Sequence, residues 1–455
     1  MRGRISQWVF ACLAFMLLLG LLGETAARAA EAQSAVAQPS PASAATSAAT
    51  GVKPGEPFDV EKATDSYLSQ LSPEKRAKSD AYFEGGYWIA LWSFLYTLGV
   101  AWILLGTWLS ARMRDLAERL TRFRALQTFF YILLYLLVTA LLEFPWAVYT
   151  DFFREHKYGL ATQNFPAWLL DQLKGLGLAL IIGGLTLTLL YAVLRWKPRT
   201  WWIWGAVVSM LIGVILIALG PVFIEPVFNK YTELKDPSLR EPILSLARAN
   251  GIETKHVYVV DASKQTNRVS ANVAGMFGTM RIALNDNLLR RVSPAGIKAV
   301  MGHEMGHYVL DHVYKAILYL IIILVTGFAF LRWAFDRVVA RRGERWGIRG
   351  VADPAGLPLL AAILSVFFFV LTPVNNTFIR TDEAEADIFG LNAAREPDGM
   401  AEVAMILSEY RKISPGPVEE WIFFDHPSGR NRIHMAMRWK AEHLGDLKAP
   451  ETKTP

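Results

Sequence analysis

Residues 293–312 read SPAGIKAVMGHEMGHYVLDH, and they hold the pattern from which the rest of the chain can be interpreted. A serine followed by a proline suits the N-cap and first turn of a helix, so the stretch predicts a helix that runs toward the next apolar segment. Residues four apart share one face of a helix, and His303 and His307 can therefore bind the same metal ion. With Glu304 between them they form H-E-x-x-H, the pattern of a zinc site with a glutamate as general base. Two exposed histidines on a solvated helix are the alternative, but the apolar flanks favour a buried helix.

The composition predicts a membrane protein, because 53% of the 455 residues are hydrophobic and only 19% are charged. Several apolar segments approach the ~20 residues that a helix needs to cross a bilayer, and tryptophans stand at their ends. These segments are 87–109, 128–150, 173–194, 201–223, 316–335 and 357–374. The polar stretches VYVVDAS and RIALND indicate short strands. We therefore expect a mainly α membrane protein, a helical bundle that carries a small α+β zinc-metallopeptidase domain.

The chain divides into seven parts. Arg2 and Arg4 before an apolar run, with small residues near Ala29, are typical of a signal peptide, although an uncleaved signal anchor would look the same. An Ala/Ser/Pro-rich stretch after it predicts a flexible linker. The expected parts are a signal peptide or signal anchor (1–30), the linker (31–56), an N-terminal region with four transmembrane helices (57–223), a metallopeptidase domain with the H-E-x-x-H helix (224–315), a transmembrane hairpin (316–374), the completion of the metallopeptidase domain (375–440) and a flexible tail (441–455).

The net charge of +6 does not indicate a nucleic-acid partner, because the arginines cluster in short loops beside apolar runs. The loops after the first, third and fifth segments are the most basic, which places them in the cytoplasm by the positive-inside rule. The signal-like N-terminus also puts residues 31–86 outside. Both arguments predict a multi-pass protein of a bacterial inner membrane with its metallopeptidase domain on the periplasmic side. Cys12 is the single cysteine, so no internal disulfide or cysteine-based metal site is possible.

Two downstream stretches offer further site residues. NNTFIRTDEAEAD at 375–387 puts Glu383 and Asp387 four residues apart, so Glu383 could bind zinc while Asp387 orients a ligand histidine. A solvated acidic helix start is the alternative for this stretch. FFDHPSGRNRI then offers His426 and Arg432, which could donate to an oxyanion as a peptide carbon becomes tetrahedral.

In these residues and the motifs around them, the chain resembles the integral-membrane CAAX prenyl protease 1 family, which consists of zinc metallopeptidases of the gluzincin kind. The resemblance covers about residues 85–440, through motifs that include EHKYGLATQNFPAWLLDQLK, VYVVDASKQTNRVSANVAG, GHEMGHYVLDH, NTFIRTDEAEAD and HPSGRNR. The resemblance implies that one zinc ion is held by His303, His307 and Glu383, and that Glu304 is catalytic. It also implies that Asp387 orients a ligand histidine, that His426 and Arg432 contact the substrate carbonyl, and that Asn272 binds substrate on an edge strand.

The family fold is a ring of membrane helices around an internal chamber, and the family processes isoprenylated C-terminal tails and clears jammed translocation channels. Two features of this chain depart from the family pattern. Ile379 stands where a serine is usual, and a signal-like segment replaces the first membrane helix of eukaryotic members. We expect a membrane-embedded zinc metalloendopeptidase whose polypeptide substrates are membrane-associated, exported or lipid-modified. The alternative is a catalytically idle chaperone or scaffold, which the loss of a ligand or of the base would favour.

Overall fold

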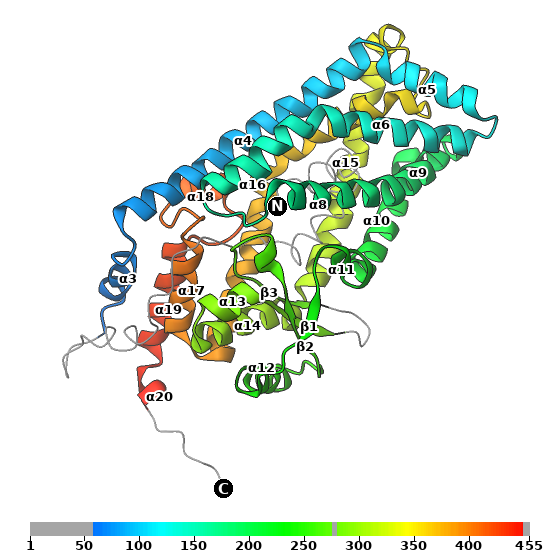
Figure 1. Ribbon diagram of the computed structural model, residues 1–455. Helices are drawn as coiled ribbons and strands as arrows, with labels where there is room; N and C mark the ends of the chain where they lie inside the picture. The colour runs from blue at the N-terminus through cyan, green and yellow to red at the C-terminus, as the bar shows by residue number, and fades with distance from the viewer. Residues whose placement is uncertain (1–57, 275–279, 449–455) are drawn as a thin grey trace.

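The computed structural model describes residues 58–274 and 280–448 (Figure 1). The predicted signal segment (1–30) and linker (31–56) lie outside these residues. The predicted tail from 441 begins with the end of one helix and a short further helix, α20 (Leu444–Lys448), and its last residues, 449–455, also lie outside.

Six helical stretches in the described residues are long and apolar enough to cross a membrane. Five of them contain a predicted segment, and the first overlaps the predicted segment 87–109, which runs past its end. The six stretches are Pro73–Gly106, Arg124–Lys157, Phe165–Trp196, Trp201–Phe228, His312–Arg342 and Pro354–Ala394. The chain is therefore a multi-pass membrane protein, as its composition predicts. Two stretches extend well beyond the apolar run, because polar helical turns continue them into the domain at one end of the bundle.

The first four spans form the N-terminal region, and π-helical turns interrupt three of them. The elements in order are α3 (Val60–Leu68), α4 (Pro73–Gly106), α5 (Leu109–Leu120), α6 (Arg124–Ala147), η1 (Val148–Phe153), α7 (Arg154–Lys157), α8 (Phe165–Leu178), η2 (Ala179–Gly183), α9 (Gly184–Trp196), α10 (Trp201–Leu219), η3 (Gly220–Ile224) and α11 (Glu225–Phe228). Residues 58–84 form α3 and the start of α4, with a break between the two helices. The break comes at Ser72, which caps α4 by accepting a hydrogen bond from the backbone N–H of Lys75.

Polar contacts hold the basic loops together at the end of the bundle that carries α5 (Figure 1). Arg114 on α5 lies 2.7 Å from Asp353, in the connection between the fifth and sixth spans. Arg349 of the same connection reaches Glu118 at 2.6 Å. The loops after the first and fifth spans therefore share one end, as the charge pattern requires. Arg114 is buried in its ion pair, so part of the charge in these loops serves packing.

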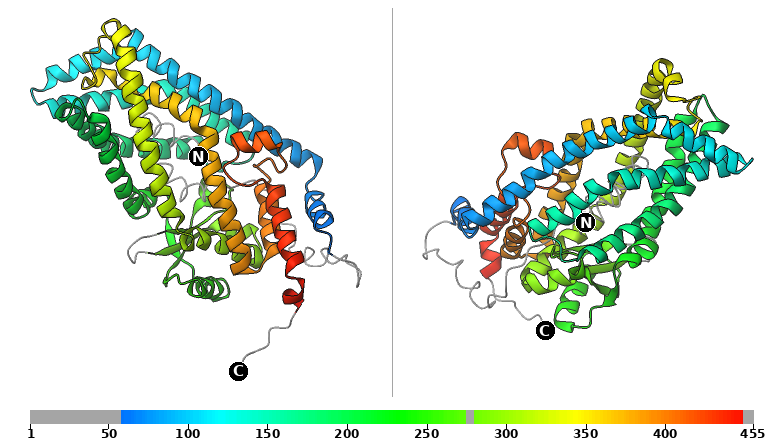
Figure 2. Two further views of the ribbon diagram at one scale, coloured as in Figure 1. Left: turned by 180° about the vertical axis from the view of Figure 1, so that it is seen from behind. Right: turned by 45° about the horizontal axis from the view of Figure 1, so that its top comes forward.

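The polar block after the fourth span folds as a small α+β unit at the opposite end of the bundle (Figures 1 and 2). Its sheet has the order β1-β2-β4-β3, in which β2 and β4 are parallel and the two outer pairs antiparallel. The strands VYVV and RIALN confirm the two predicted from sequence. The elements are β1 (Tyr231–Glu233), α12 (Pro237–Ala249), β2 (Val257–Val260), η4 (Ala262–Lys264), β3 (Ala271–Ala274), β4 (Arg281–Asn285), α13 (Asp286–Arg291) and α14 (Pro294–Val309).

The H-E-x-x-H helix α14 begins as predicted, because the Ser293 hydroxyl accepts a hydrogen bond from the backbone N–H of Gly296 at 3.1 Å. It ends at a turn in which Asp311 has a φ of 58°, and the fifth span starts there. The remaining elements are α15 (His312–Arg342), η5 (Glu344–Trp346), η6 (Pro354–Gly356), α16 (Leu357–Ala394), α17 (Pro397–Leu407), α18 (Pro417–Phe423) and α19 (Gly429–Glu442). The predicted fold class is confirmed: six spans carry a small domain that α14, α16, α17 and α19 complete.

Helices α14 and α16 cross with almost no side-chain volume between them. A Cβ atom added to Gly390 would lie 2.8 Å from the backbone nitrogen of His303 and 3.0 Å from its Cα. A Cβ added to Gly306 would lie 3.1 Å from the Cα of Ala386. Only small residues permit this approach, and it brings the helix of His303 directly against the helix of Glu383.

Candidate metal centre and active site

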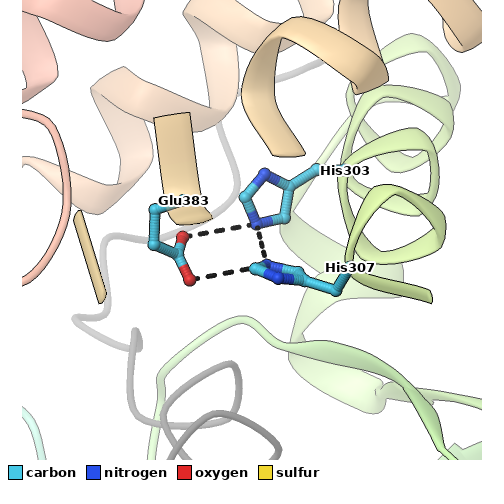
Figure 3. A group of neighbouring side chains, drawn as sticks. All are labelled: His303, His307 and Glu383. Atoms are coloured by element: carbon cyan, nitrogen blue, oxygen red, sulfur yellow. Dashed lines mark hydrogen bonds and ion pairs between the residues drawn. The ribbon is translucent and has the colours of Figure 1, made fainter. Parts of the chain in front are cut away.

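Three predicted ligands converge where α14 crosses α16. The Nε2 atoms of His303 and His307 lie 3.2 Å apart, and the two carboxylate oxygens of Glu383 lie 3.4 Å from one Nε2 each (Figure 3). His303 and His307 come from adjacent turns of α14, and Glu383 comes from the polar extension of the sixth membrane span. The structure thus brings together residues 76 positions apart in sequence through the α15–α16 hairpin.

The spacing of these atoms fits a zinc ion. With bonds of ~2.0–2.1 Å and tetrahedral angles, two zinc ligands lie about 3.3–3.4 Å apart. The observed separations of 3.2 and 3.4 Å are close to that spacing, with each carboxylate oxygen of Glu383 facing a different histidine, and one ligand atom from each residue lies within 4.8 Å of the others. The charges agree as well. Burial lowers the pKa of His303, but its contacts with Asp387 and Glu383 outweigh burial and raise that pKa to about 10. The two carboxylates therefore favour a cation at this point.

Asp387 and Arg432 fix the outer side of the site. The Asp387 carboxylate lies 2.8 Å from Nδ1 of His303, which leaves Nε2 of that ring free to face the other ligands. The Arg432 guanidinium lies 2.8 Å from Asp387 and 3.1 Å from Glu383. The side chains of Glu383, Asp387 and Arg432 are almost fully buried, and the guanidinium charge of Arg432 offsets part of the charge of the two carboxylates. Asp387 thus stands where a residue that orients His303 must stand.

His426 approaches the same centre from the loop after α18. Its Nε2 lies 3.1 Å from Glu383, and its Nδ1 lies 2.8 Å from Asp425. Arg380 on α16 holds this loop by donating to the carbonyl oxygens of Glu420 and Phe424. His426 and Arg432, which the sequence analysis names together from one stretch, therefore both contact Glu383.

Glu304 is buried in the wall of the cavity that contains His303, Glu383 and His426. Burial raises the pKa of Glu304 to about 7, although the neighbouring histidines oppose the shift. A carboxyl group that changes protonation near neutral pH can both accept and return a proton during a reaction. The remaining wall is largely apolar, which restricts water.

One contributor was missed by the sequence interpretation. Nδ1 of His307 lies 2.9 Å from Nδ1 of His312, and Nε2 of His312 lies 3.2 Å from Glu385. Because Nε2 of His307 faces the other two ligands, its Nδ1 must carry the proton and donate a hydrogen bond to Nδ1 of His312. His312 then donates through Nε2 to Glu385, which also pairs with Lys315. His307 is thus held by a chain of its own, as Asp387 holds His303.

Asn272 lies on β3, the edge strand of the sheet, opposite Ala283 of β4. This position agrees with the edge-strand location that the family resemblance implies. β3 packs against α14, and the neighbouring Ser270 and Ala271 line the cavity that holds Glu304. The open edge of the sheet therefore leads into the metal centre.

Comparisons with known proteins agree with this architecture. A family model described as "Peptidase family M48" matches residues 233–440, and one described as "CAAX prenyl protease N-terminal, five membrane helices" matches residues 60–230. The part of the second range that the structure describes holds four candidate spans.

Individual relatives match over most of their length. An "Uncharacterized metalloprotease YhfN" of Bacillus subtilis is 28% identical over 354 residues, which cover 76% of this chain and 82% of that protein. A "CAAX prenyl protease 1 homolog" of Homo sapiens is 26% identical over 410 residues, which cover 78% and 84%. The crystal structure of S. mikatae Ste24p superposes with a TM-score of 0.71 at 20% identity, over 94% of this chain and 97% of that one, and shares its fold.

Proposed function

We propose, since this chain belongs to peptidase family M48 and is a CAAX prenyl protease-like membrane metalloprotease, that it is a zinc endopeptidase of a bacterial inner membrane. The observation that carries the proposal is the ligand triangle of His303, His307 and Glu383, whose edges of 3.2–3.4 Å suit zinc. Its substrates are polypeptides that reach the domain from the membrane or from the export route, and lipid-modified C-terminal tails are among the chemistries that the relatives' names suggest.

The protein residues divide the work of peptide hydrolysis. Zinc, when bound, acts as a Lewis acid and brings the pKa of water down to about 7. Glu304 accepts the proton of the attacking water and delivers it to the leaving amine. His426 and Arg432 donate hydrogen bonds to the carbonyl oxygen as negative charge develops on it. Asp387 and His312 keep the two histidine rings in the orientation and tautomer that binding requires.

The substrate backbone adds to the open edge of β3. In an antiparallel pair, residues alternate between those bonded to the neighbouring strand and those whose backbone groups face away. Ser270 accepts a hydrogen bond from the backbone N–H of Asn285, so Ala271 and Val273 present their N–H and C=O groups outward. A peptide that pairs with them is carried past Glu304, and Asn272 supports its backbone.

The test is proteolysis by the Glu304→Gln variant, which keeps the size of the side chain and removes the base. We expect wild-type protein to cleave a denatured polypeptide such as casein, and the variant to lose at least about 1000-fold in kcat while it retains zinc. Proteolysis at the wild-type rate by zinc-loaded Glu304→Gln would refute the assignment.

The location is tested separately. The basic loops stand at the end of the bundle opposite the peptidase domain, so reporter fusions at residues 120, 200 and 345 should report the cytoplasm and one at 260 the periplasm. The reverse pattern would refute the periplasmic placement and leave the chemistry intact.

A further inference from the structure

The metal cavity contains a cation that the reaction described above does not use. Arg411 follows α17 and lines the same cavity as Glu304 and His426. It is half-buried, and within residues 58–274 and 280–448 its guanidinium has no hydrogen bond or ion pair. The cavity therefore holds an arginine that forms no ion pair with a carboxylate of the described residues.

The basic residues around Arg411 are paired, which makes the contrast informative. Lys412 contacts Glu84 at 2.6 Å and Glu419 at 2.9 Å, and Arg291 contacts Glu409 at 2.6 Å. Arg432, which lines the same cavity, contacts two carboxylates. A half-buried guanidinium without a counter-ion has lost part of its hydration, and no ion pair offsets that desolvation cost. An anion that binds to it would supply the missing ion pair.

The surroundings of Arg411 define the chemistry of that anion. The wall of the cavity that Arg411 lines includes Val300, Met400, Val403 and Leu407, all apolar. Arg411 and His426 line the same cavity, so the charge of Arg411 lies in the space where the substrate would bind. A carboxylate carried on an apolar peptide segment complements both features, because guanidinium and carboxylate form charge-assisted hydrogen bonds of good geometry.

We propose that Arg411 binds a carboxylate of the substrate and thereby selects the register in which the peptide lies across the metal centre. The carboxylate is either the free C-terminus of the polypeptide or an acidic side chain close to the cleaved bond. This inference rests on the proposed function, since it names the substrate chemistry of the same site. A peptide is then held at two points, by Arg411 and by the edge of β3. Because both contacts are fixed, the same peptide bond always lies beside Glu304.

The decisive measurement is peptide binding to the zinc-loaded Glu304→Gln protein, which does not depend on cleavage. Three fluorescent versions of an apolar decapeptide serve as probes: free C-terminus, amidated C-terminus, and amidated with one internal glutamate. We expect at least one carboxylate peptide to bind about 10- to 100-fold more tightly than the fully neutral peptide. Adding Arg411→Gln should abolish that difference, and adding Arg411→Lys should retain part of it.

The controls separate this inference from the proposed function. Arg438→Gln removes a solvent-exposed arginine of α19 that pairs with Glu442, and it should leave the discrimination unchanged. Equal binding of all three peptides, or a preference that survives Arg411→Gln, would overturn the role of Arg411. Loss of zinc in Arg411→Gln would do the same, because the proposed role is confined to the substrate. Failure of wild-type protein to cleave any polypeptide would overturn the proposed function, whatever the binding results.

Discussion

The close crossing of α14 and α16 predicts that a single methyl group, placed away from the chemistry, will disrupt the metal centre. In Gly390→Ala the new Cβ would lie 2.8 Å from the backbone nitrogen of His303, where ordinary contact requires 3.4–4 Å. The nitrogen belongs to the backbone of α14, and the Cβ is fixed to the backbone of α16, so no side chain can move aside. The helices must therefore separate by about 0.6 Å, which exceeds the ~0.5 Å tolerance of a preorganised site.

Two costs follow from that separation. Overpacking of this kind destabilises a protein by about 1–3 kcal/mol. Glu383 moves away from His303 and His307 with its helix, and zinc affinity should fall about 10- to 100-fold, which is about 1.4–2.7 kcal/mol. The assay is zinc competition against a chelator of known affinity, with thermal unfolding of the metal-free protein measured alongside.

The matched control is Gly99→Ala on α4, a helical glycine whose added Cβ would meet nothing within 4 Å. It should leave zinc affinity unchanged, and its stability should stay the same or rise slightly. Wild-type zinc affinity in Gly390→Ala would refute the claim that this crossing sets the ligand spacing.

Two further changes test the supporting contacts. His312→Ala removes the acceptor of the His307 Nδ1 proton, so zinc affinity should fall about tenfold with little change in the metal-free melting temperature. His312→Gln keeps an acceptor and should recover part of the lost zinc affinity. An unchanged affinity in His312→Ala would contradict the tautomer assignment. Arg268→Met leaves buried Glu155 without the guanidinium 2.7 Å away and should cost about 3–5 kcal/mol in unfolding free energy. Arg438→Met, at an exposed pair, should cost less than about 0.5 kcal/mol. Equal losses of unfolding free energy in the two variants would argue against a buried pair.

Much of the architecture follows from local patterns in the sequence. Apolar runs of bilayer length predict all six spans, because no other use of such runs is common in a protein with so few charges. The N-cap at Ser293 and the four-residue spacing of His303 and His307 predict helix α14 and the face on which both histidines lie. Glu383 and Asp387 share a face for the same reason, and the structure places both at the metal centre.

Other features depend on contacts between distant elements. His312 follows His307 by five residues, a spacing that a continuous helix would point elsewhere, and only the turn at Asp311 brings the two rings together. Arg411 lies in an irregular turn whose direction no local pattern predicts. The close crossing of α14 and α16 corresponds to a sequence pattern that the sequence analysis did not use. Small residues recur every four positions on both helices, at Gly302 and Gly306 and at Ala386 and Gly390.

The central claim is that His303, His307 and Glu383 hold one zinc ion. The direct test is the zinc content of detergent-purified protein by mass spectrometry, for wild type and for Glu383→Ala, with Thr381→Ala, at an exposed position of the same helix, as the control. The account predicts about one zinc per chain in wild type and in Thr381→Ala, and less than about a tenth of that in Glu383→Ala. A full equivalent of zinc in Glu383→Ala, or none in wild type, would contradict it.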